Sequence, residues 1–218
     1  MKNKPTFKRV CAYIIDIVLV SFISSLFASI EFINPKLDEY NKNYEEYRNY
    51  VQSITSGSET VDTSELLNGK KVNDFTYNIA SSGIITSEIT LIISILYFIV
   101  FQYYNNGKTV GKALLKIQVK SKDNKKLKLT QMILRSVIIN SLLTSLISII
   151  CILTLSKSNY LTASNYIQMI DMAVMLVTFG MVMFREDGRG LHDLLANTIV
   201  VPTEDVKEVV IVKKTKGK

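Results

Sequence analysis

A few acidic and basic side chains lie within or beside long apolar segments of this sequence. Asp16 lies inside an apolar run over residues 10–30, and Arg9 precedes it by seven positions. Asp171 lies within another apolar run, and Glu88 lies near the start of a third. A carboxylate at the centre of a membrane helix costs about 2.5–3.5 kcal/mol on insertion scales. Acidic groups in such positions mark ion pathways and proton relays, so these three carboxylates are candidate ion- or proton-binding residues.

The spacing of Arg9 and Asp16 predicts a partner for the first of these carboxylates. Seven residues are about two helical turns, so both side chains lie on one face of a helix. We therefore expect Arg9 to pair with Asp16 and to keep it ionised. Removing one partner of a buried ion pair costs about 3–5 kcal/mol. A structural role and an ion-binding role for Asp16 both stay open.

Four long apolar stretches must position these residues. They cover about residues 10–31, 84–104, 132–155 and 161–184 of the 218-residue chain, which is 48% hydrophobic. Each is close to the 20 residues or so that cross about 30 Å of hydrocarbon. The sequence predicts an all-α membrane protein with four transmembrane helices. Because the first run is too long for a signal peptide and contains Asp16, we interpret it as a helix that is retained.

The distribution of charge predicts the orientation of these helices. The N-terminal arm carries three lysines and Arg9 without an acid, and residues 104–135 carry eight lysines and Arg135 against Asp123 alone. By the positive-inside rule both segments are cytoplasmic. Four crossings then place both termini in the cytoplasm. The richness in Lys, Asn and Ile is typical of an AT-rich bacterial genome, so we expect a bacterial plasma membrane.

We predict a single transmembrane domain over residues 1–204, followed by a basic tail at 205–218. An extracytoplasmic insertion occupies residues 34–83, and a cytoplasmic basic loop occupies residues 105–131. Within the insertion, apolar and aromatic residues recur every three or four positions over 37–54, which predicts an amphipathic helix with a tyrosine stripe. That stripe either packs on its neighbours or the membrane surface, or docks a partner.

The basic loop predicts short interfacial structure and a small β element. The piece NNGKTVGKALLK reads as a turn followed by a short amphipathic helix on the membrane. KIQVKS and KLKLT alternate apolar and polar residues around a turn, which predicts a hairpin. A phosphate-binding loop needs a glycine where Gln102 stands, so Gly-Lys-Thr does not indicate nucleotide binding. The lysines of the loop predict contact with anionic lipid.

Metal and catalytic sites find little support in the sequence. Cys11 and Cys151 lie near opposite faces of the bilayer, too far apart for a disulfide. His192 is the single histidine, so no zinc-binding spacing exists. No nucleophile stands beside a base. We expect no cofactor, no metal, no enzymatic activity and no nucleic-acid partner.

Three segments, taken in order, resemble the RDD family of bacterial membrane proteins. FKRVCAYIIDIVLV resembles the family's opening helix, with Arg9 as the signature arginine and Asp16 as the first signature aspartate. GKTVGKALLKIQV resembles its Gly-Lys-x-x-Gly-Lys loop. GRGLHDLLANTIVV resembles its closing motif, with Asp193 as the second signature aspartate and Asp187 as the alternative. The last two segments also resemble each other, which indicates an internal repeat.

The resemblance covers most of the chain outside residues 34–83, and two features depart from it. The long insertion is one, and Gly190, where many members carry Gln, is the other. The resemblance implies a membrane protein of a family suspected of transport, some of whose members look like sodium–proton antiporters. Because a fold does not determine a function, the site itself must decide.

Two hypotheses about function follow. The first is transport of a small ion or solute, coupled to a cation or proton, in which Asp16 and Asp171 bind the ion; four helices are few for a path, so a homo-oligomer is expected. The second is a non-transporting scaffold or accessory protein. In that case Asp16 is structural, Asp193 or His192 anchors the last cytoplasmic piece, and the tyrosine stripe docks a partner membrane protein.

Overall fold

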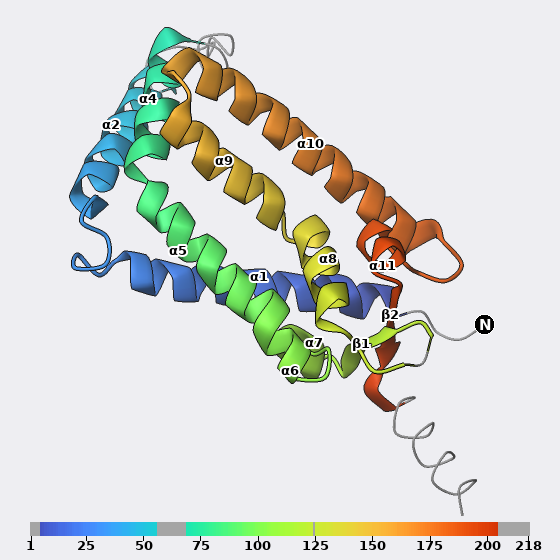
Figure 1. The fold of residues 1–218 in the computed structure, drawn as a ribbon. Helices are drawn as coiled ribbons and strands as arrows, with labels where there is room; N and C mark the ends of the chain where they lie inside the picture. Colours follow the sequence, from blue (N-terminus) through green and yellow to red (C-terminus); the bar gives the residue numbers. More distant parts are fainter. Residues whose placement is uncertain (1–4, 56–68, 124, 205–218) are drawn as a thin grey trace, which may run out of the picture. The chain divides into compact units, whose positions relative to one another are not determined.

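The computed structural model describes residues 5–55, 69–123 and 125–204. Within these ranges the chain is mostly helical and carries a two-stranded sheet (Figure 1). The predicted basic tail at 205–218 lies outside the described residues.

Among the described residues, three helices are long and apolar enough to cross a membrane. They are α1 (Thr6–Ala28), the continuous helix Ile84–Tyr104 and α10 (Lys157–Phe184). These confirm the helices predicted over three of the four apolar runs. The continuous helix has three parts in chain order: α5 (Ile84–Ile95), the π-helix η1 (Leu96–Phe101) and α6 (Gln102–Tyr104).

The remaining apolar run is broken. The single helix predicted over 132–155 is wrong, because the structure has α8 (Leu129–Ile139) and α9 (Leu142–Thr154), bent by 62° at a short break. Helix α8 ends at Ile139, Asn140 is its C-cap, and Ser141 follows with a positive φ of 52°, which an α-helix does not tolerate. The pair makes a fourth span if the two helices cross together.

Contacts divide the chain into two compact units, each assembled from segments far apart in the sequence. The first unit comprises the residues up to Phe22, Ile92–Leu143, and the residues from Ile170 onward. The second comprises Ile23–Leu91 and Thr144–Met169. The prediction of a single transmembrane domain over residues 1–204 stays a prediction.

The small sheet belongs to the first unit. Strands β1 (Ile117–Ser121) and β2 (Thr198–Pro202) pair antiparallel, so that Val119 faces Val200 in the register. Both valines are buried. The hairpin predicted between KIQVKS and KLKLT is therefore wrong: β1 pairs with a strand almost eighty residues later, and the end of KLKLT enters α8. Burying the apolar faces of both strands favours this long-range pairing.

The two strands end similar pieces of chain. Helix α7 (Val110–Leu114) precedes β1, and α11 (Leu191–Leu195) precedes β2 (Figure 1). At the corresponding junctions, Lys116 has a φ of 55° and Asn197 a φ of 49°. A non-glycine residue with positive φ is uncommon, so its presence at both junctions supports the internal repeat predicted from sequence.

The second unit contains the insertion. Helix α2 (Leu37–Thr55) confirms the amphipathic helix predicted over 37–54, and it packs on α4 (Lys70–Ser82). Tyr47 and Tyr50 contact the Phe75 ring, with centroids 5.9 and 5.5 Å away. One member of the tyrosine stripe, Tyr47, and the nearby Tyr50 therefore pack on a neighbouring helix of their own unit.

Contacts of α4 also reach the start of α10 within the second unit. Lys157 forms an ion pair with Asp74. The Tyr77 and Tyr160 rings meet edge to face, with centroids 5.7 Å apart. Lys157 also lies over the Tyr77 ring, so an ion pair and a cation–π contact from the same side chain both stabilise the packing of α4 on the start of α10.

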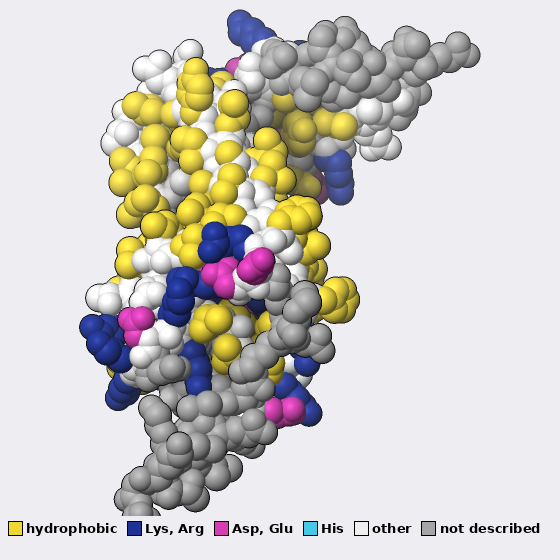
Figure 2. Space-filling view, turned by 90° about the vertical axis from the view of Figure 1, so that its right-hand side faces the viewer, with side chains coloured by type: hydrophobic (Ala, Val, Ile, Leu, Met, Phe, Trp, Pro, Cys, Tyr) yellow, Lys and Arg dark blue, Asp and Glu magenta, His cyan; other side chains and the backbone are white. Residues whose placement is uncertain are grey.

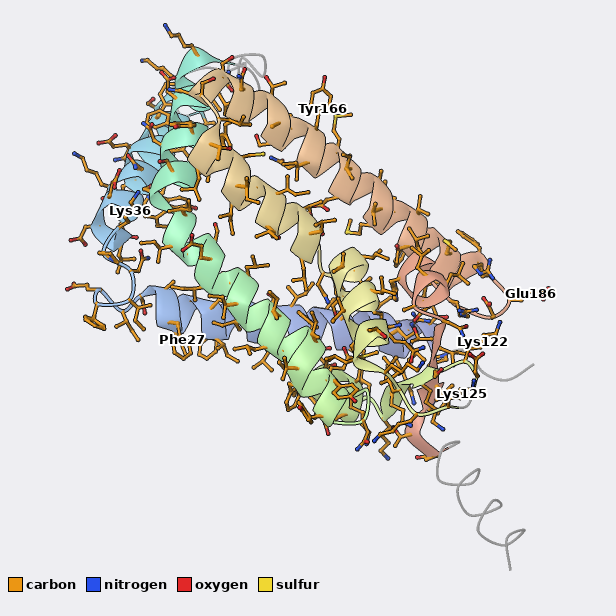
Figure 3. The ribbon with its side chains drawn as sticks, in the orientation of Figure 1. Phe27, Lys36, Lys122, Lys125, Tyr166 and Glu186 are labelled. Carbon is orange, nitrogen blue, oxygen red and sulfur yellow. The ribbon has the colours of Figure 1, made fainter. Side chains whose placement is uncertain are left out.

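Large apolar side chains are exposed along α1, α9 and α10, as lipid-facing helices require. Figure 2 shows a broad field of hydrophobic side chains, with many Lys, Arg, Asp and Glu side chains below it and a few more at its upper edge. Phe27 and Tyr166 point outward from their helices, while Lys122 and Lys125 project from the connection after β1 (Figure 3). These exposed lysines contrast with the buried cations described below.

Candidate functional site

Asp16 lies in the first unit, and hydrogen-bond donors surround its fully buried carboxylate. The Tyr97 hydroxyl donates to Oδ1 at 2.7 Å, and the Thr109 hydroxyl donates to Oδ2 at 2.5 Å. The Gly111 N–H donates to Oδ1 at 2.8 Å, and the Lys112 ammonium lies 3.5 Å from Oδ2. Four donors, one of them charged, therefore satisfy this carboxylate.

Two local features bring these donors to Asp16. Tyr97 belongs to the π-helix η1, a kind of segment that is frequent at functional sites, and its hydroxyl also accepts the Val110 N–H at 3.0 Å. Gly111 permits close approach, because a Cβ there would lie 2.3 Å from the Ala12 carbonyl oxygen. A glycine at this position is therefore what lets the α7 backbone reach the carboxylate.

Lys112 supplies the charged donor to Asp16, and its ammonium also lies 3.1 Å from the Thr109 hydroxyl. Burial lowers the pKa of Lys112 to about 8; Asp16 opposes that change, and Arg135 and Arg9 add to it. An ammonium shifts its pKa readily when buried, whereas a guanidinium stays charged. Lys112 is therefore the cation of this site whose charge responds to pH.

Asp193 is a second fully buried carboxylate, and two arginines hold it. Arg9 donates to Oδ2 and Arg135 donates to Oδ1, so each oxygen accepts from a guanidinium. The Thr198 hydroxyl donates to Oδ1 at 3.1 Å, and the Gly190 N–H lies 3.3 Å from Oδ2. This single side chain joins α1, α8, α11 and β2.

Arg189 and His192 complete the surroundings of Asp193. Arg189 donates to the carbonyl oxygens of Thr198 and Asp193, both at 2.9 Å. His192 Nε2 lies 3.4 Å from Arg9 Nη2 and from Asp193 Oδ2. Burial, together with nearby cations, holds the pKa of His192 well below its usual value, so the ring is neutral. Arg9 can only donate toward Nε2, and no described hydrogen bond runs from Nε2 to Asp193 Oδ2, so we assign the ring hydrogen to Nδ1.

The structure corrects the pairing expected from sequence. Arg9 pairs with Asp193, and Asp16 pairs with Lys112, so the expected Arg9–Asp16 pair is replaced by two others. The physical reason is distance along the helix. Seven residues rise about 10 Å, so two side chains can share a face without touching. The three signature residues thus lie in one unit, two of them fully buried and Arg9 partly buried, but Arg9 pairs with the second aspartate.

A cavity of about 390 Å³ lies among these groups, within the size range of ligand pockets. Three of its described lining residues are cations, Arg9, Lys112 and Arg135, and none is acidic. Most of the remaining wall is apolar and includes Phe98, Met175, Leu176, Phe179 and Val182.

Two buried polar atoms of residues that line the cavity have no hydrogen-bond partner within the described part of the chain. They are Thr178 Oγ1 and His192 Nδ1. Both residues are almost completely buried. A buried polar group without a partner costs about 1–3 kcal/mol and calls for an explanation. A polar ligand in the cavity that reached these two atoms would satisfy both.

The buried charges do not balance. Two buried cations, Arg135 and Arg189, and two partly buried ones, Arg9 and Lys112, face the carboxylates of Asp16, Asp193 and Asp187, which leaves a formal excess of one positive charge. Uncompensated buried charge is strongly destabilising, so this arrangement favours an additional anion. We call the four cations the basic cluster: Arg9, Lys112, Arg135 and Arg189.

The other predicted site residues lie elsewhere. Asp171 is half-buried on α10, and Glu88 is exposed on α5 in the second unit. Neither they nor Asp16 belong to the described lining of the cavity. Asp187, the alternative second signature aspartate, is largely exposed and bonds Arg185 at 3.0 and 3.1 Å. The hydrogen bond from Arg185 lowers the pKa of Asp187 to about 2.

Sequence reasoning missed several residues of the site. Tyr97 reads as one member of an interfacial aromatic belt, and nothing in the sequence connects it to Asp16. The GKTVGK piece was informative, because the residues that fail as a phosphate loop supply Thr109, Gly111 and Lys112 to the carboxylate. Arg135 mirrors Arg9 at the start of an apolar run, which is a signal for a second buried arginine.

Comparison with known proteins adds the family. No curated protein and no solved structure matches this chain. The model of the RDD family matches residues 4–197, a range that includes both buried carboxylates and the whole basic cluster. Since this match covers most of the chain, the protein belongs to the RDD family, a family of membrane proteins.

Proposed function

We propose that this protein is a membrane transporter for a small ion or solute, in which the basic cavity holds the solute and Lys112 carries a coupled proton. One observation carries the proposal. Lys112 lines the cavity and also lies 3.5 Å from the buried carboxylate of Asp16. The same amine is therefore in contact with a fixed internal charge and with the space that a solute would occupy.

The electrostatics of Lys112 provide a coupling mechanism. Asp16 favours its charged form, while burial and the neighbouring Arg135 and Arg9 disfavour it. An anion in the cavity would add a second favourable charge and raise the affinity of Lys112 for a proton. By linkage, protonation of Lys112 would raise the affinity for the anion by the same factor. Anion and proton would then bind together.

The coupled proton is carried here by Lys112, whereas the sequence-based hypothesis assigned ion binding to Asp16 and Asp171. Asp16 was expected to bind the transported ion, but its oxygens already accept four donors. A cation in the cavity would meet three positive side chains. The role of Asp171 as an ion-binding residue stays a prediction.

Proton movement in proteoliposomes tests the proposal. Vesicles loaded with a pH-sensitive dye would receive gradients of sodium, chloride, phosphate and octanesulfonate, the last being an anion with an apolar chain. We expect protein-dependent proton movement with at least one anion. Lys112→Gln should abolish it, whereas Lys122→Gln, which removes an exposed lysine outside the cavity lining, should preserve it. Equal movement in the Lys112→Gln protein would overturn the assignment.

The scaffold hypothesis also has one favourable observation. Asp193 bonds groups from α1, α8, α11 and β2, which is what a purely structural centre would do. If the wild-type protein moves no protons under any gradient and co-purifies with one membrane protein, the scaffold is the better description.

A further inference from the structure

We infer that the cavity binds an anionic amphiphile, with a small oxyanion head and one apolar chain, that reaches the cavity from the lipid phase. This inference rests on the proposed function, because it names the class of solute for the same cavity.

The head would be held at the basic end of the cavity. Arg9 and Arg135 share one carboxylate, Asp193, so their two charges meet a single negative charge. A monoanionic head would therefore balance that pair. Guanidinium groups bind carboxylates and phosphates through several hydrogen bonds at once. Acid groups are absent from the described cavity lining, so no carboxylate of that lining faces the head.

Two uncharged groups favour an oxygen-rich head. The Nδ1–H of neutral His192 is a donor, and Thr178 Oγ1 can donate or accept. Neither atom has a partner among the described residues, and both residues line the cavity. An oxyanion accepts hydrogen bonds and would satisfy them, whereas a halide is a weaker match for two separate donors.

The apolar wall argues for a chain attached to the head. Phe98 and Val182 are buried and line the cavity, so they present hydrocarbon to whatever occupies it. A small inorganic anion would leave this surface without apolar contact. Burying an alkyl chain there contributes about 0.8 kcal/mol for each methylene group.

The rim of the cavity indicates where the ligand comes from. Met175, Leu176 and Phe179 line the cavity, yet 59%, 60% and 49% of their surfaces are exposed. All three belong to α10, one of the membrane-spanning helices. Side chains that are exposed on such a helix face lipid, so the cavity opens toward the hydrocarbon.

Tryptophan fluorescence can test this inference, because the chain contains no tryptophan. Leu176→Trp places a fluorophore at the rim, and Leu153→Trp places one at an equally exposed leucine outside the described cavity lining. Both proteins, in neutral detergent, would be titrated with 11-bromoundecanoate, whose bromine quenches nearby tryptophan. The matched cation, an 11-bromoundecyl trimethylammonium salt, serves as the charge control.

We expect saturable quenching of Trp in the Leu176→Trp protein by the carboxylate and only gradual, unsaturable quenching in the Leu153→Trp protein. Adding Lys112→Gln should weaken saturable binding about tenfold, the loss of one charge-assisted contact, and adding Lys122→Gln should not. Equal quenching by the carboxylate and the cation, or binding unaffected by Lys112→Gln, would overturn the inference.

Two further measurements distinguish a bilayer lipid from a free single-chain amphiphile as the molecule that supplies the oxyanion head. Nanodiscs with brominated phosphatidylglycerol, compared with brominated phosphatidylcholine, report whether a bilayer lipid occupies the cavity in place of a free single-chain amphiphile. Saturable binding without proton movement would keep this inference and overturn the proposed transport. Proton movement driven by an inorganic anion, with no saturable binding of amphiphile, would keep transport and overturn this inference.

Discussion

Asp16 and Asp193 are both fully buried carboxylates of the same unit, yet their donors differ in charge. Asp193 accepts from two guanidinium groups, one on each oxygen, and from the Thr198 hydroxyl. Asp16 accepts from two hydroxyl groups and a backbone N–H, and its one cation lies 3.5 Å away. Strong charge pairing thus defines one site, and neutral hydrogen bonds define the other.

This difference separates a fixed site from a responsive one. Arginine does not lose its proton in proteins, so the charge around Asp193 is constant with pH. Lysine can lose its proton when buried, so the charge beside Asp16 is adjustable. The cavity is lined by cations from both sites. One site therefore provides constant attraction for an anion, and the other provides a proton that can follow it.

The largest expected effect is the loss of the Asp193 charge. Asp193→Asn leaves Arg9 and Arg135 buried without a counter-charge, which should destabilise the protein by about 3–5 kcal/mol. Denaturant unfolding in mixed micelles, followed by circular dichroism, measures the change. Asp187→Asn is the control, because its close ion pair with Arg185 is largely exposed and its contact with Arg189 is long, at 4.0 Å, so the loss should cost at most about 1 kcal/mol. Similar values for both variants would contradict a charge-dependent centre.

The sequence predicted this contrast only in part. Asp16, predicted as a costly charge, and Asp193, expected from the family resemblance, are both fully buried, and Arg9 is partly buried. The partners could not be predicted, because the donors to Asp16 come from residues 97–112 and those to Asp193 from Arg9, Arg135, and residues 190–198. Hydrophobic periodicity places helices, but it contains no information about which helix faces meet.

Stability as a function of pH tests the adjustable site. The pKa of Lys112 is lowered to about 8 in the folded protein from 10.5, so the unfolded chain binds more protons between these values. Stability should therefore rise with pH across this window, by about 3 kcal/mol in total, and fall as pH drops through 8. Unfolding at several pH values, in wild type and Lys112→Met, isolates the contribution.

Other groups also titrate in this range, so the difference between the two proteins is the quantity of interest. Lys122→Met should follow the wild-type curve, because Lys122 is exposed. If the Lys112→Met curve has the same slope as wild type, Lys112 does not titrate near pH 8, and the two carboxylate sites would be equally fixed.

Removing the charge of Asp16 should have a smaller effect than removing that of Asp193. In Asp16→Asn the carbonyl oxygen still accepts some of the donors, while the new amide hydrogens face the remaining ones. We expect a loss of about 2 kcal/mol, because hydrogen bonds to a charged group contribute about 1.5–3 kcal/mol. The same unfolding assay measures it. A loss as large as that of Asp193→Asn would show that Lys112 depends on Asp16 as strongly as the arginines depend on Asp193.

Topology limited prediction in a similar way. The apolar run over 132–155 predicts one helix, because Asn140 and Ser141 are only two polar residues among many apolar ones and do not signal a break. The chain nevertheless bends by 62° at this point. That break separates α8, which carries Arg135, from α9. The internal repeat predicted the topology better than the apolar runs did, because the two similar pieces of chain end in two strands that pair with each other.

The smallest expected effect concerns Thr178, a residue that lines the cavity. Thr178 Oγ1 is buried without a partner among the described residues, so Thr178→Val should stabilise the ligand-free protein by about 1 kcal/mol. Thr162→Val is the control, because the Thr162 hydroxyl bonds the Ser158 carbonyl at an exposed position of the same helix, and little change is expected. Loss of stability in Thr178→Val would mean that the hydroxyl already has a partner. Stabilisation together with weaker amphiphile binding would instead show that the Thr178 hydroxyl contacts the ligand in the cavity that cations of both carboxylate sites line.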